Sequence, residues 1–282
     1  MIDASKVLYT IEKATQATQK YPYRQGRVLR IPDASDILVV GDLHGRMDLF
    51  KKAVQLADLK ANPGRHLVIQ ELMHGTQTYE DGSDNSHLTV DMVALLKCQF
   101  PLRVHYLIGN HELSQATNRR VSKNGKDLNQ LFDMGVAFAY PEHTDQFLEA
   151  YRKLVEELPA LILLPNGVTI SHSLPDSTKM DSFDVRKLEV LPTTNEETTP
   201  GGSLHSLLWG RDTSEHNAQA FLEKVRGKWL ITGHIPVFQG VDFPNPRQIV
   251  LDAHLDVGGY ALIPGQREIS PGEFHGLAGV LQ

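Results

Sequence analysis

Three short apolar segments, each followed by a polar loop and then a helical pattern, constrain the fold of this chain more than any other feature. The apolar segments are 37–40, 66–72 and 103–108, and the helical patterns run over 47–59, 88–97 and from 112 onward. Short β-branched runs that stop at turn residues are typical of buried strands. Three strand–loop–helix units in succession predict an α/β protein with a largely parallel sheet.

The remainder of the chain departs from this alternation. Apolar residues at helical spacing predict a helix over 3–22 and an amphipathic helix over 144–158. Residues 161–164 and 168–171 flank Pro165-Asn166-Gly167 and predict a hairpin, because Asn-Gly tolerates positive φ.

Further strands are expected late in the chain, at 229–232, 248–251 and 260–263. Few helices separate them, so we expect a second, more antiparallel sheet. Two stretches rich in turn residues, 76–86 and 192–203, are expected to be surface loops.

Length and composition exclude several classes of protein. The chain has 282 residues and a formal net charge of -6, which argues against a dedicated nucleic-acid binder. Its single cysteine, Cys98, excludes an intramolecular disulfide framework and favours a reducing compartment. We find neither a secretory signal pattern nor an apolar run of the roughly 18 residues that a membrane span needs. A soluble, cytoplasmic protein without membrane partners is the expectation.

Polar side chains follow each of five predicted strands, at the point where the strand ends. Ligands of open α/β sheets bind at the carboxyl ends of the strands, so these side chains are expected to converge. Asp, Glu, Asn and His together supply oxygen and nitrogen ligands that suit two divalent cations. The residues concerned are Asp42, His44, Glu71, His74, Asn110, His111, Glu112, His172 and His234.

Each of these motifs alone has an ordinary structural explanation. Asp42 or Asn110 could cap the helix that follows it, and Glu112 could be a carboxylate in the first turn of that helix. A lone histidine is more often a hydrogen-bonded core or loop residue than a ligand. The recurrence of the same residue classes at five strand ends favours a metal site.

Taken in order, these motifs resemble the calcineurin-like metallophosphoesterase superfamily, and within it the phosphoprotein phosphatase branch. That pattern runs G-D-x-H-G, G-D-x-x-D-R-G, G-N-H-E, a histidine after a hydrophobic strand, and G-H. Its first, third and last motifs are intact at 41–45, 109–112 and 233–234. The resemblance covers about residues 37–260 and implies two mixed β-sheets packed as a sandwich flanked by helices. It further implies one domain over 1–282, with a lead-in at 1–36, a catalytic core at 37–263 and a tail at 264–282.

The resemblance also implies roles for the site residues. It assigns Asp42 and His44 to one metal and Asn110, His172 and His234 to a second. Glu71 stands where the family has a bridging aspartate, and His111 stands where it has the general acid. The cofactors implied are two divalent transition metal ions, with Mn, Fe, Zn and Ni all suited to an N/O shell, and the nucleophile implied is a hydroxide held between them.

The second motif departs from the family pattern, since the chain reads Gln70-Glu71-Leu72-Met73-His74-Gly75-Thr76. The bridging ligand gains a methylene group. The aspartate that orients the catalytic histidine becomes His74. The phosphate-binding arginine becomes Thr76.

Three residues are candidates to bind substrate in place of that arginine: Arg211, His74 and Arg46. Arg211 lies in a W-x-R stretch similar to one that binds phosphate in some relatives, although it could instead pair with Asp212 or Asp252. His74 could equally be an exposed loop residue. His205 and His254 are further candidates for the pocket, without an assigned role.

The resemblance implies hydrolysis of a phosphate ester, with a phosphorylated protein as the usual substrate. Nucleotide pyrophosphates and dinucleoside tetraphosphates are alternative substrates on the same scaffold. A catalytically degenerate relative that binds phosphorylated ligands is the alternative without activity. The sequence leaves the oligomeric state open, and the 76–86 loop is a candidate to lie over the cleft.

Overall fold

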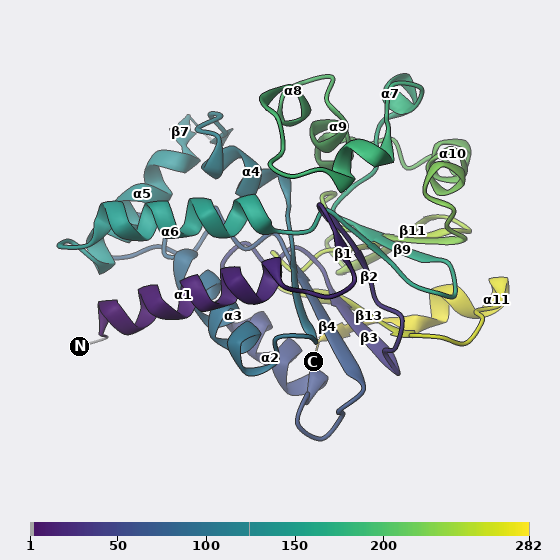
Figure 1. The fold of residues 1–282 in the computed structure, drawn as a ribbon, viewed down its shortest axis with the longest axis horizontal. Coiled ribbons are helices and arrows are strands. Elements are labelled where there is room, and N and C mark those ends of the chain that lie inside the picture. Colours follow the sequence, from purple (N-terminus) through teal and green to yellow (C-terminus); the bar gives the residue numbers. More distant parts are fainter. Residues whose placement is uncertain (1–2, 124, 282) are drawn as a thin grey trace.

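The computed structural model describes residues 3–123 and 125–281, and most of its strands form two mixed sheets (Figure 1). The first sheet has the order β14-β13-β3-β4-β5, in which β3, β4 and β5 are parallel and β13 is antiparallel to both of its neighbours. Its strands are β3 (Asp36–Val40), β4 (Arg65–Gln70), β5 (Val104–Leu107), β13 (Gly258–Pro264) and β14 (Ala278–Leu281).

The second sheet has seven strands in the order β1-β2-β8-β9-β10-β12-β11. Strands β9, β10 and β12 run parallel, while β8 and β9 form the predicted hairpin. The strands are β1 (Arg24–Gln25), β2 (Val28–Arg30), β8 (Leu161–Leu163), β9 (Val168–Ser171), β10 (Trp229–Thr232), β11 (Val241–Asn245) and β12 (Gln248–Leu251). A separate two-stranded ribbon joins β6 (Ser122–Lys123) to β7 (Lys126–Asp127).

The two sheets pack face to face, and side-chain alternation along the strands produces the layers. In β3, Ile37 and Val39 join a core cluster made from the inner faces of both sheets. Leu38 and Val40, which point the opposite way, join the cluster that contains the surrounding helices. The predicted sandwich of two mixed sheets flanked by helices is therefore confirmed.

Helices cover both outer faces of the sandwich (Figure 1). On one side lie α1 (Ala4–Gln19), α2 (Met47–Ala57), α3 (His87–Gln99), α5 (Leu128–Ala139) and α6 (Thr144–Glu157). On the other lie α7 (Ser177–Met180), α9 (Ser203–Trp209) and α10 (Glu215–Val225). Shorter elements are α4 (Asn110–Ala116), η1 (Val185–Glu189), α8 (Asn195–Thr198), α11 (Pro271–Phe274) and η2 (His275–Leu277).

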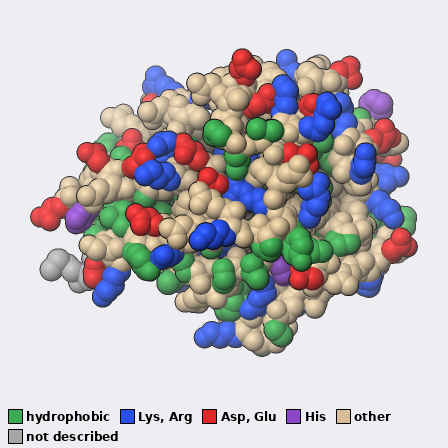
Figure 2. Space-filling view, viewed as in Figure 1, with side chains coloured by type: hydrophobic (Ala, Val, Ile, Leu, Met, Phe, Trp, Pro, Cys, Tyr) green, Lys and Arg blue, Asp and Glu red, His purple; other side chains and the backbone are tan. Residues whose placement is uncertain are grey.

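Two observations concern membrane and nucleic-acid partners. Among residues 3–123 and 125–281, no helix combines the length and hydropathy that crossing a lipid bilayer requires. On the face shown in Figure 2, Lys and Arg side chains are interspersed with Asp and Glu. The cytoplasmic location and the lack of a nucleic-acid partner stay predictions.

The sheet assignment of one late strand was wrong. Residues 260–263 were expected in the second sheet, but they lie in β13, which pairs antiparallel with β3 in the first sheet and matches Ala261 to Val39. The second sheet is also less antiparallel than expected, since β2–β8, β9–β10 and β10–β12 are parallel pairs. A short apolar run shows that a strand exists but not which sheet accepts it.

The segments outside the expected core belong to the same two sheets. The lead-in before residue 37 supplies α1, β1 and β2, and the tail after residue 263 supplies β14. The expected loop at 192–203 contains the short helix α8. Helices α5 and α10 were not predicted.

A buried histidine pair lies between the sheets. His66 on β4 and His105 on β5 share a hydrogen bond of 3.0 Å between His66 Nδ1 and His105 Nε2. Burial lowers the pKa of His66 to about 4 and lowers the pKa of His105 well below its ordinary value. Both rings are therefore neutral in the folded protein, whereas an unfolded histidine binds a proton below about pH 6.5.

This pair makes stability depend on pH in a defined window. The stability from keeping His66 neutral is present above about pH 6.5 and is lost as the pH falls toward about 4, because only the unfolded chain binds the proton there. We expect His66 alone to lower the free energy of unfolding by about 2 kcal/mol between pH 7 and pH 5. Urea unfolding at both pH values measures this loss.

The matched variants are His66→Gln and His216→Gln, the second on an exposed histidine. We expect His66→Gln to weaken the pH dependence and His216→Gln to leave it as in the wild type. An unchanged pH dependence in His66→Gln would contradict the assignment.

Candidate metal centre

Parallel strands of both sheets end at one edge of the sandwich, and the polar residues that follow them meet there. Strands β3, β4 and β5 lead into Asp42, Glu71 and Asn110, whereas β9 and β10 lead into His172 and His234. A parallel bridge between Asp42 and Asp252, which follows β12, joins the two sheets at this edge. The structure thus brings residues from the first and second halves of the chain into one cluster.

His172 lies at the centre of this cluster and is fully buried. Gln70 donates its amide N–H to Val40 O, so its Oε1 faces His172 Nδ1 at 3.2 Å. His172 Nδ1 therefore carries the proton and Nε2 keeps a lone pair. Burial lowers the pKa of His172 to about 3, which agrees with a neutral ring.

Three further ligand atoms surround that lone pair. Glu71 Oε2 lies 2.7 Å from His172 Nε2, Asn110 Oδ1 lies 2.9 Å from it, and His234 Nδ1 lies 3.1 Å from it. Two of these are acceptor oxygens, and a lone pair on the neutral His172 ring cannot donate to them. A cation between these atoms would satisfy them all, so the donor set fits a bound metal.

Glu71 is shared by two clusters of ligand atoms, each within 4.8 Å: His44–Glu71–His111 and Asp42–Glu71–His172. Its Oε1 accepts the backbone N–H of His111 at 2.8 Å, while Oε2 has no hydrogen-bond partner among the described residues. The backbone of Glu71 adopts φ of 46°, a left-handed conformation that non-glycine residues seldom adopt. This turn, directly after β4, brings the longer Glu71 side chain back into the cluster.

Asp42 and His44 complete the set of predicted ligands. Asp42 Oδ2 accepts the backbone N–H of His234 at 2.6 Å, and Oδ1 is unpartnered among residues that the structure describes. The ring Nδ1–H of His44 donates to Met73 O at 2.9 Å, which leaves Nε2 with a lone pair. Burial and the charges of Glu71 and Asp252 raise the pKa of Asp42 well above its usual range, and burial raises the pKa of Glu71 to about 7. Buried carboxylates this close together require a compensating positive charge.

Two motif glycines leave room for these carboxylates. A Cβ at Gly109 would lie 1.8 Å from Glu71 Oε2, and one at Gly233 would lie 2.0 Å from Asp42 Oδ1. Any larger residue would displace the carboxylate. The glycines of the third and last motifs are thus explained by space in the cluster.

Glu112 holds the loop that carries Glu71. Its Oε1 accepts the N–H groups of Leu72 and Met73 at 2.8 and 3.0 Å and the Tyr106 hydroxyl at 2.8 Å. Its Oε2 accepts the Gly109 N–H at 3.0 Å, in the first turn of α4. Glu112 therefore caps α4, as its first-turn position indicated, and it also supports the metal-site loop.

His111 and His74 are hydrogen-bonded to each other through their Nδ1 atoms, at 2.8 Å. His74 Nε2 also lies 2.9 Å from Gln115 Oε1. Both ring nitrogens of His74 are therefore engaged, which leaves neither for a substrate. His74 occupies the place of the orienting aspartate rather than that of the missing arginine.

The two arginine candidates differ in their surroundings. Arg46 forms an ion pair with Asp48 and donates to the backbone oxygens of His254 and Leu255, so its guanidinium is already engaged. Arg211 has an exposed side chain, and its charge contributes to lowering the pKa values of His172 and His234. Unlike Arg46, Arg211 forms no side-chain ion pair among the residues that the structure describes, so it is the arginine candidate still open to an anion.

Three residues at the site were missed by sequence reasoning. Gln70 orients His172, Gln115 contacts His74, and Asp133 accepts the Gln115 side-chain N–H at 2.7 Å. Gln115 follows His111 by four positions on a helix, which is a signal for a shared face. Asp133 lies on the unpredicted helix α5, so the sequence held no signal for it.

His254 and His205, considered without a role, lie in different settings. The ring of His254 packs edge-on to His44 with centroids 5.5 Å apart, and its Nδ1 donates to Asp252 Oδ1 at 2.6 Å. His205 stacks on Trp209 at 4.3 Å between ring centroids. Of the two, His254 lies beside the cluster.

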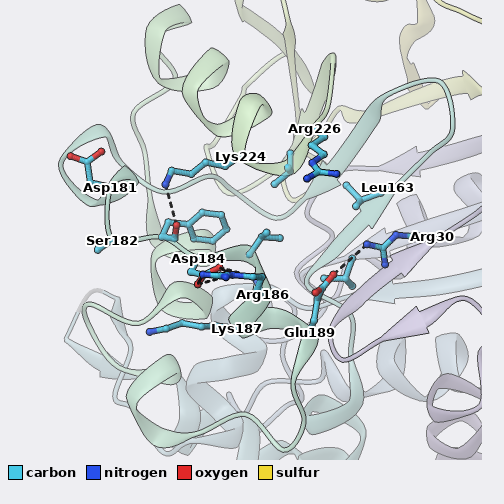
Figure 3. Close-up of a pocket in the computed structure, with 14 residues that line it drawn as sticks. Arg30, Leu163, Asp181, Ser182, Asp184, Arg186, Lys187, Glu189, Lys224 and Arg226 are labelled. Atoms are coloured by element: carbon cyan, nitrogen blue, oxygen red, sulfur yellow. Dashed lines mark hydrogen bonds and ion pairs between the residues drawn. The ribbon is translucent and has the colours of Figure 1, made fainter.

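A charged pocket of about 730 Å³ lies elsewhere (Figure 3). Its lining includes Leu163, the last residue of β8. Because β8 runs antiparallel to β9, this end of β8 lies away from the cluster. Arg30 pairs with Glu189 and Arg186 pairs with Asp184, so these basic residues already have acidic partners. None of the predicted site residues lines this pocket.

Comparisons with known proteins agree with this geometry. A family model described as "Calcineurin-like phosphoesterase" matches residues 35–263. A curated protein from Encephalitozoon cuniculi, named a probable serine/threonine-protein phosphatase, is 25% identical over 186 residues, which are 64% of this chain and 35% of that protein. The chain therefore spans about a third of the length of that relative.

Solved structures share the fold at low sequence identity. A protein serine/threonine phosphatase from Saccharomyces cerevisiae aligns with a TM-score of 0.69 and 16% identity, covering 100% of this chain and 90% of that one. The cold-active protein-tyrosine phosphatase of a Shewanella species aligns with a TM-score of 0.57 and 13% identity, covering 95% and 84%. The family match covers every predicted ligand and most strands of both sheets, and this chain belongs to the calcineurin-like phosphoesterase family.

Proposed function

We propose that this chain hydrolyses phosphate monoesters at a centre of two divalent metal ions. The observation that carries the proposal is the group of acceptor atoms around the unprotonated His172 Nε2, at 2.7–3.1 Å. Asp42, His44 and Glu71 would hold one ion, and Glu71, Asn110, His172 and His234 would hold the other. Mn, Fe, Zn and Ni all suit these oxygen and nitrogen ligands.

When bound, such ions neutralise charge on the phosphoryl group and activate water for attack on phosphorus. Arg211 would contact the phosphoryl oxygens from the rim of the site. Protonated on both ring nitrogens, His111 would deliver its Nε2 proton to the leaving oxygen while its Nδ1–H is held by His74. These are the roles that the chain's own side chains would play.

A phosphorylated protein is the substrate we favour. Two observations support this choice: the names of the E. cuniculi and S. cerevisiae proteins, both described as serine/threonine phosphatases, and the open setting of Arg211. We further propose a single domain and a cytoplasmic location.

Metal analysis combined with a hydrolysis assay tests the proposal. We expect elemental analysis of the purified protein to find about two divalent transition metal ions per chain. Chelation should abolish hydrolysis of 4-nitrophenyl phosphate, and added Mn²⁺ should restore it. Chelation should also lower the melting temperature, because bound cations offset the repulsion between Asp42 and Glu71.

Substrate class is tested on the same metal-loaded protein. Phosphoserine and phosphothreonine peptides should be hydrolysed faster than a dinucleoside tetraphosphate. Preference for the tetraphosphate would overturn the protein-phosphatase assignment while keeping the metal centre. Stoichiometric metal with no turnover of any of these compounds would identify a binding relative instead of an enzyme.

A further inference from the structure

Four side chains form a hydrogen-bonded chain that runs away from the metal centre. His111 Nδ1 lies 2.8 Å from His74 Nδ1, and His74 Nε2 lies 2.9 Å from Gln115 Oε1. Gln115 Nε2 then donates to Asp133 Oδ1 at 2.7 Å. His111 and Gln115 share one face of α4, His74 lies in the loop after β4, and Asp133 lies on α5.

The hydrogen positions in this chain follow from its last member. The Asp133 carboxylate only accepts hydrogen bonds, so the Gln115 amide nitrogen must face it and the amide oxygen must face His74. His74 Nε2 must then carry a proton, which leaves a lone pair on His74 Nδ1. His111 Nδ1 must in turn donate to that lone pair. Asp133 thereby determines the tautomer of His74 and makes His111 Nδ1 the donor in the bond between the two rings.

The packing around the chain favours this arrangement. His74 is buried, and its ring packs edge-on to Phe132 with centroids 6.1 Å apart, so the ring has little room to turn. Gln115 and Asp133 line a cavity of about 280 Å³ that opens to solvent. The chain therefore runs from a buried imidazole to a half-buried carboxylate.

The arrangement has a consequence for His111. With Nδ1 donating to His74, its remaining ring nitrogen, Nε2, is the atom available to a substrate. If Gln115 no longer held His74, the His74 ring could donate from Nδ1 instead. The donor–acceptor match that holds the His111 ring in this orientation would then be lost, because His111 Nδ1 and His74 Nδ1 would both point a proton at each other unless one ring turned.

We propose that Gln115 and Asp133 are positioning residues that act through His74 to fix the orientation of the His111 ring. This inference rests on the proposed function and adds to it two residues and the hydrogen-bonded chain that connects them to His111. It also explains how the site tolerates an imidazole where the family has a carboxylate, because the carboxylate has moved to Asp133, two hydrogen bonds further from His111.

The test compares two aryl phosphates on the metal-loaded full chain. Phenyl phosphate has a poor leaving group that needs proton donation, whereas 4-nitrophenyl phosphate has a good one that needs little. We expect Gln115→Met, which keeps the side-chain length, to lower kcat for phenyl phosphate about 10- to 100-fold. For 4-nitrophenyl phosphate the loss should be smaller than about threefold, with KM unchanged for both.

Two further variants sharpen the result. Adding His74→Asp to Gln115→Met should restore the ratio of the two rates, since a carboxylate at 74 accepts from His111 Nδ1 without help from Gln115. Asp145→Leu makes the same chemical change as Asp133→Leu in the same cavity but outside the chain, and should leave both rates unchanged.

The outcomes separate the inference from the proposed function. A wild type that hydrolyses neither compound, although loaded with metal, would contradict the proposed function. An active wild type in which Gln115→Met changes both rates equally, or neither, would overturn the inference. If Gln115→Met does not fold, Asp133→Leu, which removes the acceptor at the half-buried end, must show the same selective loss, and an unaltered rate ratio there would overturn the inference equally.

Discussion

Replacing Asp42 by Asn is expected to lower phosphatase activity about a thousandfold while making the metal-free protein more stable. Activity falls because Asn lacks the negative charge that holds a cation. Stability rises because burial and the neighbouring charges of Glu71 and Asp252 raise the pKa of Asp42, so its ionised form is unfavourable in the fold without metal. Steady-state rates and thermal unfolding after chelation measure the two effects.

The opposite signs of these two effects make the test discriminating. Asp256→Asn is the matched control, since Asp256 is exposed on the loop beside the site, and both quantities should stay near the wild type. Near-normal activity in Asp42→Asn would rule out the two-metal mechanism. A loss of activity together with a less stable metal-free protein would show that Asp42 serves the fold instead.

Replacing His111 by Asn is expected to lower kcat for phenyl phosphate about 10²- to 10⁴-fold, the range typical of a lost general acid. The His111 ring lies beside His44, with ring centroids 4.8 Å apart. His111 is assigned as the general acid and not as a metal ligand. Metal content should therefore stay near two ions per chain, as measured by elemental analysis.

Leaving-group dependence distinguishes proton donation by His111 from a structural role. The loss should shrink for 4-nitrophenyl phosphate, whose leaving oxygen needs little protonation. His216→Asn, on an exposed histidine, is the control and should match the wild type on both compounds. Equal losses on both compounds, or loss of one metal ion, would contradict the assignment of His111 as general acid.

The residue pattern predicted the strands, the helices and two sheets, and the family resemblance implied that these sheets pack as a sandwich. The continuous apolar run at 37–40 and its counterparts in later strands give each strand two buried faces, so both faces of a sheet need cover. That requirement leads to two sheets with helices outside. The pattern did not place residues 260–263, because pairing partners depend on chain path rather than on local periodicity.

The candidate ligands were also accessible from the sequence, because the carboxyl ends of parallel strands meet at a common edge. This local rule placed Asp42, Glu71 and Asn110 together without knowledge of any contact. The role of His74 was not accessible in the same way. Whether its ring faced substrate or His111 depended on Gln115, 41 positions later.

The sequence by itself therefore determined the strand ends and the residue types that gather there, since both follow from local apolar runs and from the direction of parallel strands. Its motifs also carried the resemblance that implied the layered architecture. Only the tertiary structure decided which lone pairs face one another. The Gln70 amide orients His172, and Asp133 on α5 orients His74 through Gln115. Hydrogen-bond direction depends on angstrom-scale contacts between distant segments, and the order of residues along the chain does not contain those distances.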